Sequence, residues 1–177
     1  MKFSKIAGIA ALMAMSSVHA DDTSMSSVSM GLGSVRFGGD VDSSSTLHLK
    51  ADGFSKVSDY GLAYGLGIDL VTLSSSNSTS SYKKNSNGNY TLGLQFKLGY
   101  SLYSLINYPV HIKVEAGYGV TRFNDENKYG AQFGTSLDVA VYKDYSVGIA
   151  YKQVSTGVSG SVYDIYTSNI VFIQKSI

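Results

Sequence analysis

Large apolar residues occupy every second position over long stretches of this chain. The alternation is clearest between residues 60 and 70, where tyrosine, leucine and isoleucine alternate with glycine, alanine and one carboxylate, Asp69. A period of two is the pattern of a β-strand, because successive side chains point to opposite faces. The same period predicts four further strands, at residues 90–102, 110–120, 129–141 and 145–151.

Two weaker strands precede these five. Residues 28–32 alternate, but the apolar positions then slip by one place to Val35 and Phe37. A β-bulge near Gly33-Ser34 would account for the slip, because a bulge inserts one extra residue and changes the facing beyond it. The second strand, around residues 47–51, alternates only weakly.

A last strand spans about residues 162–174, and its facing is ambiguous. We predict that Tyr166, Ile170 and Phe172 point outward. The chain therefore has eight predicted strands, and the connections between them alternate in length. The connections at 56–59, 104–109 and 143–144 are short, whereas those at 37–45 and 73–89 are long. This rhythm predicts an antiparallel up-and-down sheet.

Eight such strands fit two kinds of closed barrel, a soluble one with the bulky face inside and a transmembrane one with the bulky face in lipid. The opposite face is a poor water-exposed surface, because at residues 61–67 it carries only glycine and alanine. The apolar stripe at 60–70 has the roughly 9–11 residues that a tilted strand needs to cross the hydrocarbon. Several stripes also end in tyrosine, which favours a membrane interface. The pattern favours the transmembrane barrel.

In a transmembrane barrel the polar face of each strand lines the lumen. Charges of both signs in a narrow lumen are costly unless they pair, so we expect a network of salt bridges that includes Asp69, Lys97 and Glu115. The predicted polar lumen set is Asp69, Gln95, Lys97, Lys113, Glu115, Gln132, Asp138 and Lys152, and the same parity adds His48, Lys50 and Asp52 from the weak second strand.

With these stripes and connections the chain resembles the small bacterial outer-membrane β-barrels, the eight-stranded OmpA/OmpX type. The resemblance covers residues 21–177 and rests on pattern rather than on a signature motif. It implies an all-β, eight-stranded antiparallel up-and-down transmembrane β-barrel, with both termini in the periplasm, long loops outside the cell and insertion by the barrel-assembly machinery. Such barrels usually end in an aromatic residue, whereas this chain ends in Ile177.

Composition and charge restrict the remaining choices. Lys2 and Lys5, the apolar run 6–15 and the small residues before Asp21 match a cleaved signal peptide, so we expect a signal at 1–20 and a barrel domain at 21–177. The chain has 14 basic and 13 acidic residues and no cysteine. There is no basic patch for nucleic acid, and no thiolate nucleophile or metal ligand.

Catalytic and metal sites find little support in the sequence. His48 and His111 lie on different predicted strands and both face the lumen, whereas the lipid A deacylase kind of barrel carries a histidine and a serine close together on its lipid-facing side. Asp40 and Asp42 supply too few oxygens for calcium. We therefore expect no enzyme activity, no metal and no cofactor.

The low-complexity connection at 73–89 contains Tyr82, Lys83 and Lys84, which we single out as candidate contacts to lipopolysaccharide or to a partner surface. We expect a structural or surface-interaction protein of the cell outer membrane, with a plugged polar lumen, contacts to outer-membrane lipid and lipopolysaccharide, and a monomeric state. The alternatives are a narrow porin-like channel for ions or small solutes, a lipid-modifying barrel enzyme and, weakest, a soluble ligand-binding barrel.

Overall fold

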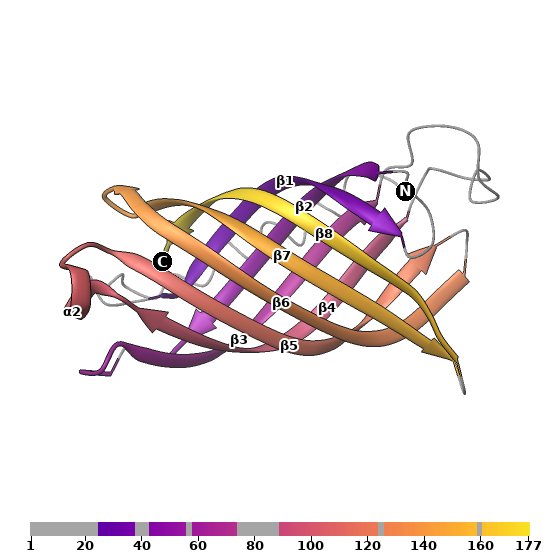
Figure 1. Cartoon of the computed structure of the whole chain (residues 1–177), viewed down its shortest axis with the longest axis horizontal. Coiled ribbons are helices and arrows are strands. Elements are labelled where there is room, and N and C mark those ends of the chain that lie inside the picture. The colour runs from indigo at the N-terminus through magenta and orange to yellow at the C-terminus, as the bar shows by residue number, and fades with distance from the viewer. Residues whose placement is uncertain (1–24, 38–42, 56–57, 74–88, 124–125, 159–160) are drawn as a thin grey trace.

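The computed structural model describes residues 25–37, 43–55, 58–73, 89–123, 126–158 and 161–177. Eight strands form a closed barrel in which each strand pairs with its sequence neighbours and β8 pairs with β1, so the predicted fold class is confirmed (Figure 1). The strands are β1 (Ser27–Phe37), β2 (Ser43–Phe54), β3 (Leu62–Leu73), β4 (Tyr90–Ser101), β5 (Val110–Phe123), β6 (Glu126–Tyr142), β7 (Tyr145–Val158) and β8 (Ser161–Ser176).

The two ends of the barrel differ. At one end, here called the terminus end, the backbone N–H of Ile177 donates to the carbonyl of Ser26, and the β2–β3, β4–β5 and β6–β7 connections lie there. At the other, here called the long-loop end, lie the β1–β2, β3–β4, β5–β6 and β7–β8 connections. β7 extends beyond its predicted end at residue 151, because it continues to Val158, and β8 begins at Ser161.

The bulky face of the strands points outward, as the transmembrane interpretation requires. Leu66, Leu94, Tyr118 and Phe133 are each more than half exposed on the outside of the barrel. Asp69, by contrast, is fully buried on the inside, like most charged side chains of the strands. This arrangement, with apolar side chains outside and charged side chains inside, is the reverse of that in a soluble domain. An apolar outer surface of this kind is compatible with contact to lipid.

The predicted facing of the last strand is wrong. Tyr166 and Ile170 are each 2% exposed and Phe172 is 8% exposed, and all three point into the barrel. The reason lies in the neighbouring strands, because Phe172 stands opposite Gly31 on β1 and Gly148 on β7. A Cβ atom on Gly31 would lie 2.6 Å from the Ile170 side chain and 2.9 Å from that of Phe172, so these glycines leave the space that the apolar side chains fill.

The predicted bulge at Gly33-Ser34 is also wrong. β1 keeps an unbroken register with β2 and with β8 through this point. Val35 is apolar because it points inward, where it is fully buried, and not because the strand changes phase. The irregularities of register lie elsewhere, between Ala140 and Tyr142 on β6 and between Ser155 and Thr156 on β7.

A single turn of helix, α2 (Tyr103–Ile106), lies in the β4–β5 connection at the terminus end (Figure 1). It ends at Asn107, which adopts a left-handed conformation and donates its backbone N–H to Tyr103. Tyr103, Leu105 and Ile106 are all exposed. No helix within the described residues has the length and apolar character needed to cross a membrane.

Candidate functional site

The centre of the lumen holds a group of four charged side chains from three strands. Glu115 on β5 lies 2.5 Å from Lys50 on β2 and 2.9 Å from Lys97 on β4, measured from its Oε2 to each Nζ. Lys97 also lies 2.6 Å from Asp52, which is 4.0 Å from Lys50. Lys97 is fully buried, and the other three are at most 9% exposed. Each cation therefore faces two carboxylates, which compensates the cost of burying it.

A second group lies on the long-loop side of this centre. Lys152 on β7 forms an ion pair with Asp69 on β3, and Asp69 is also 3.3 Å from the Nε2 atom of His48. Beside it, the side-chain amide of Gln95 donates to the Oε1 atom of Gln132 at 3.3 Å. All five side chains are buried. Not every polar atom of the group is paired, because Asp69 Oδ1, Gln95 Oε1 and Gln132 Nε2 have no hydrogen-bond partner among the described residues.

A third group lies on the terminus side. Asp138 on β6 is 3.0 Å from Lys113 and 3.0 Å from the Nδ1 atom of His111. Lys113 also donates to the side chain of Gln174 on β8 at 2.9 Å. The imidazole of His111 is about one-fifth exposed, so this group approaches the mouth of the barrel.

The structure places all eight lumen residues named from the sequence inside the barrel and brings them together in these three groups. Lys50, Asp52 and His48 complete the groups, and the parity of the second strand had indicated them. Gln174 was missed because the facing of β8 was misjudged. Within the described residues the buried lumen side chains are four lysines (Lys50, Lys97, Lys113 and Lys152) and four carboxylates (Asp52, Asp69, Glu115 and Asp138), so their formal charges cancel.

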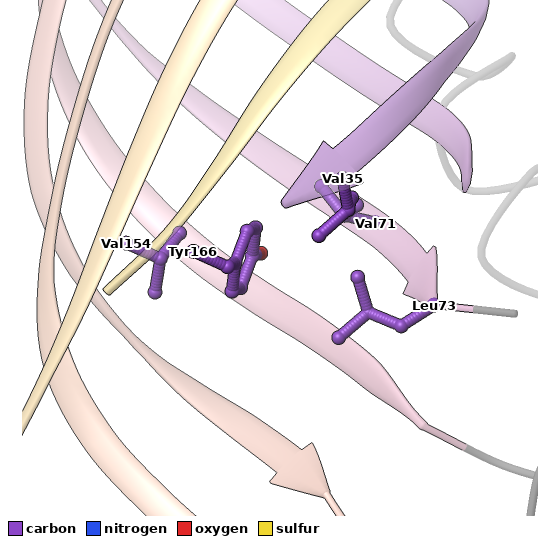
Figure 2. Packing of buried hydrophobic residues seen from close by; sticks show 5 residues of the cluster. All are labelled: Val35, Val71, Leu73, Val154 and Tyr166. Carbon is purple, nitrogen blue, oxygen red and sulfur yellow. The ribbon is translucent and has the colours of Figure 1, made fainter. Parts of the chain in front are cut away.

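Apolar layers lie beyond the charged groups at both ends. At the long-loop end Val35, Val71, Leu73, Val154 and Tyr166 form a buried cluster (Figure 2). At the terminus end Met25 is buried, and the ammonium of Lys113 lies 5.8 Å from the centre of the Phe54 ring. Among the described residues, the polar centre is thus bordered by an apolar cluster at the long-loop end and by Met25 and Phe54 at the terminus end.

The Tyr166 side chain connects the apolar cluster to the strands around it. Its hydroxyl donates to the Oγ1 atom of Thr91 at 2.7 Å, and that atom lies 3.0 Å from the Oγ1 atom of Thr121. The ring can therefore lie across the lumen while its one polar group remains satisfied.

Among the described residues, the charged groups leave a small internal space between them. One internal cavity measures about 10 Å³ and is lined by His48, Lys50, Lys113 and Phe172 among others. A cavity of this size holds roughly one water molecule. Long side chains occupy the space beside two of the inward glycines, because a Cβ atom on Gly134 would lie 2.6 Å from Glu115 and one on Gly99 would lie 2.5 Å from Met25.

Three solved structures have this architecture. Neisserial surface protein A (NspA) gives a TM-score of 0.54 at 11% identity, covering 86% of this chain and 97% of that one. The outer membrane enzyme PagL gives 0.51 at 18% identity, covering 85% and 99%. Ail, the attachment invasion locus protein of Yersinia pestis, in complex with the heparin analogue sucrose octasulfate, gives 0.51 at 12% identity, covering 85% and 96%. The fold is that of the small outer-membrane β-barrels. No protein-family model and no curated protein matches the sequence.

Among the described residues of the barrel, the two histidines have carboxylate partners and no nucleophile beside them. His48 contacts Asp69 and His111 contacts Asp138, and both pairs lie on the lumen side. A hydrolase needs a nucleophile within hydrogen-bond reach of its base. No hydroxyl of the described residues bonds to either imidazole among the observed hydrogen bonds. The described residues also contain no group of three or more histidines, cysteines and carboxylates that could hold a metal.

The predicted surface contacts of the barrel, Tyr82, Lys83 and Lys84, lie outside the described residues, as does the predicted signal peptide at 1–20. Their roles stay predictions from the sequence. The charged side chains that the structure does describe at this site lie in the lumen, where they form ion pairs with one another.

Proposed function

We propose that this protein is an integral outer-membrane barrel with a structural or surface-interaction role, whose plugged lumen serves as a rigid support for the loops at its long-loop end. One observation carries the proposal: the lumen is closed by mutually paired charges between two apolar layers. An eight-stranded barrel has an interior just wide enough for side chains to fill it, and the burial of the described inward side chains supports such a filled interior here.

This interior argues against the alternative of a narrow channel. An ion crossing the lumen would have to break contacts such as the 2.5 Å pair between Glu115 and Lys50, and then pass the cluster that contains Tyr166. Separating buried partners leaves uncompensated charge at a cost of about 3–5 kcal/mol. The balance of lysines and carboxylates also offers no net attraction to an anion or a cation.

Conductance across a planar bilayer tests the closed lumen. We expect the purified barrel to leave the bilayer silent under conditions in which a general porin, added as a positive control, opens steadily. Steady single-channel openings by the purified protein would overturn the plug and favour the channel.

Membrane location and assembly belong to the same proposal. The exposed apolar belt supports insertion in the outer membrane through the barrel-assembly machinery, after removal of the signal at 1–20, with the folded barrel as a monomer. We expect the protein in the sarkosyl-insoluble fraction, with a band that shifts on boiling and an N-terminus at Asp21. A protein that remains in solution without detergent would contradict this.

We further propose that the barrel is not an enzyme. PagL is named as an outer membrane enzyme, but likeness at 18% identity concerns the fold, and function depends on a site. His48 and His111 face the lumen and pair with carboxylates, so they are not directed at a lipid substrate. Lipid A incubated with the protein should keep its mass. A mass change that disappears in His48→Ala or His111→Ala would overturn this.

The interaction role is assigned to the loops. Ail is named as an attachment invasion locus protein and was solved with a polyanionic heparin analogue, which makes surface binding a reasonable role for a barrel of this fold. Tyr82, Lys83 and Lys84 are our candidate contacts to lipopolysaccharide. Replacing both lysines by glutamine should weaken binding of lipopolysaccharide vesicles, whereas Lys143→Gln at the opposite end should not. Equal binding by all three proteins would exclude the lysines.

A further inference from the structure

The outer wall of the barrel is not equally apolar all around. On β5 the outward residues from Val110 to Val120 are all apolar, which gives the 11 residues that a tilted strand needs to cross the hydrocarbon. On β8, between Thr167 and Lys175, the outward apolar residues are Val171 and Ile173. These two cover about 10 Å of strand, less than half of the roughly 25 Å apolar band of outer-membrane barrels.

Polar side chains border this short stripe toward the long-loop end. Asn169 on β8 is exposed and stands opposite Ser34 on β1, which is exposed as well. One step further Thr167 stands opposite Arg36 on β1, and also opposite Gln153 on β7. The outward faces of β8 from 167 to 175 and of β1 from 28 to 36 are called the seam below.

The terminus end of the seam contains a groove and a cation. The groove has a volume of about 210 Å³, and its walls include Val28, Met30, Leu49 and Ile173. Lys175 lies at its edge beside Tyr145, is exposed, and is paired in register with Val28 and Tyr145. An apolar groove with an ammonium at one end has the chemistry to hold a lipid chain together with its phosphate.

We propose that the seam thins the bilayer locally and that the groove beside Lys175 is a phospholipid site. The acyl chain lies along Val28 and Ile173, the phosphate pairs with Lys175, and headgroups on the opposite surface descend to Asn169 and Arg36. The proposal rests on the proposed function, because it requires the barrel to lie in a membrane. A hydrophobic stripe shorter than the hydrocarbon is accommodated by thinning the bilayer.

Charge favours lipid over a second copy of the chain as the occupant. The described outward residues of the seam include the cations Arg36 and Lys175 and no carboxylate. Two copies related by a twofold axis along the membrane normal would bring Arg36 toward Arg36 and Lys175 toward Lys175. Like charges repel, whereas lipid phosphates are anionic and complement both residues.

Site-directed spin labels test the thinning, because the chain has no native cysteine. Asn169→Cys places a label on the seam and Leu94→Cys places one on β4, at the opposite wall. In lipid vesicles we expect the label at 94 to be reached by oxygen and the label at 169 by a water-soluble nickel chelate.

Equal depth in lipid at both sites would overturn the thinning and leave the proposed function intact. A water-exposed label at 94 would instead contradict the membrane location itself. Disulfide-linked dimers of Asn169→Cys would place a second copy at the seam and overturn lipid as its occupant.

Native mass spectrometry with phosphatidylglycerol tests the site beside Lys175. We expect Lys175→Gln to bind this lipid about five-fold more weakly, which is the loss of one lysine–lipid charge interaction. Lys143→Gln is the matched control, because Lys143 is an exposed lysine at the same end and outside the groove. Wild-type affinity in Lys175→Gln, or displacement of the lipid by inorganic phosphate alone, would overturn the site.

Discussion

Replacing Glu115 by leucine is the sharpest perturbation of the lumen. The carboxylate is shared by two lysines, at 2.5 Å from Lys50 and 2.9 Å from Lys97. Without it, Lys50 keeps only Asp52 at 4.0 Å, and four buried lysines face three carboxylates. Removing one partner of a buried ion pair costs about 3–5 kcal/mol. We expect Glu115→Leu to lower the free energy of unfolding by that amount.

The assay is urea unfolding in detergent micelles, in which folded and unfolded protein are separated as two bands on an unboiled gel. The matched variant adds Lys97→Met to Glu115→Leu, which removes one cation with the carboxylate and leaves Lys50 paired with Asp52. If charge pairing stabilises the lumen, the double variant should be more stable than the sum of the single changes predicts, by roughly 1–3 kcal/mol.

Two results would refute this reasoning. One is an unfolding midpoint of Glu115→Leu equal to that of the wild type. The other is strict additivity of Glu115→Leu and Lys97→Met, because residues that share a hydrogen-bonded ion pair should couple. Either result would mean that the paired charges of the lumen are replaceable packing and that the plug depends on its apolar layers.

Three further predictions concern packing and the membrane interface. Gly134→Ala should lower the free energy of unfolding by about 1–3 kcal/mol, because its Cβ would lie 2.6 Å from a lumen carboxylate. Gly53→Ala should be tolerated, because its Cβ meets nothing closer than 4.0 Å. The urea unfolding midpoint of each variant measures the effect. Tyr166→Phe should cost about 1 kcal/mol through its lost 2.7 Å hydrogen bond, and the exposed Tyr118→Phe should cost less in the same assay. The natural sequence has no tryptophan, so Leu105→Trp introduces a single fluorophore. Its fluorescence should be quenched by headgroup-level lipid quenchers, because α2 exposes its apolar residues at the terminus end of the barrel, where the proposed function places a membrane interface. Quenching only by an aqueous agent would place α2 in water.

The sequence was sufficient to predict facing where one face of a strand is bulky and the other small or charged. β3 is such a case, because Leu66 and Ile68 alternate with Gly67 and Asp69, and only one orientation satisfies both sets. In β8 large apolar residues occur on both faces, with Ile170 and Phe172 on one and Val171 and Ile173 on the other. The size of the side chains therefore could not decide which face of β8 points inward. The deciding partner is Gly31 on β1, which stands opposite Phe172 although it lies 141 residues earlier in the chain.

The sequence could not predict which charged residues form ion pairs inside the lumen, and the reason is different. Alternation assigns Asp52 and Lys97 to the interior but does not say that they meet. They lie on β2 and β4, which are not neighbours in the sheet, and their 2.6 Å contact crosses the lumen above Gly67 of β3. The contact depends on the tilt and stagger of the closed barrel, which are properties of all eight strands together.

The inward glycines decide how this interior is used. A glycine has no side chain, so in the sequence alone each inward glycine marks a place that other side chains could occupy or leave empty. In the structure that space is taken by the ends of long side chains: Glu115 fills the position beside Gly134, and the ring of Phe172 and the Cβ of Asp138 fill that beside Gly148. Small and long residues are therefore complementary parts of one packed layer. Within the described residues the interior is therefore occupied mainly by the barrel's own side chains, and the proposed function accordingly assigns binding to the loops.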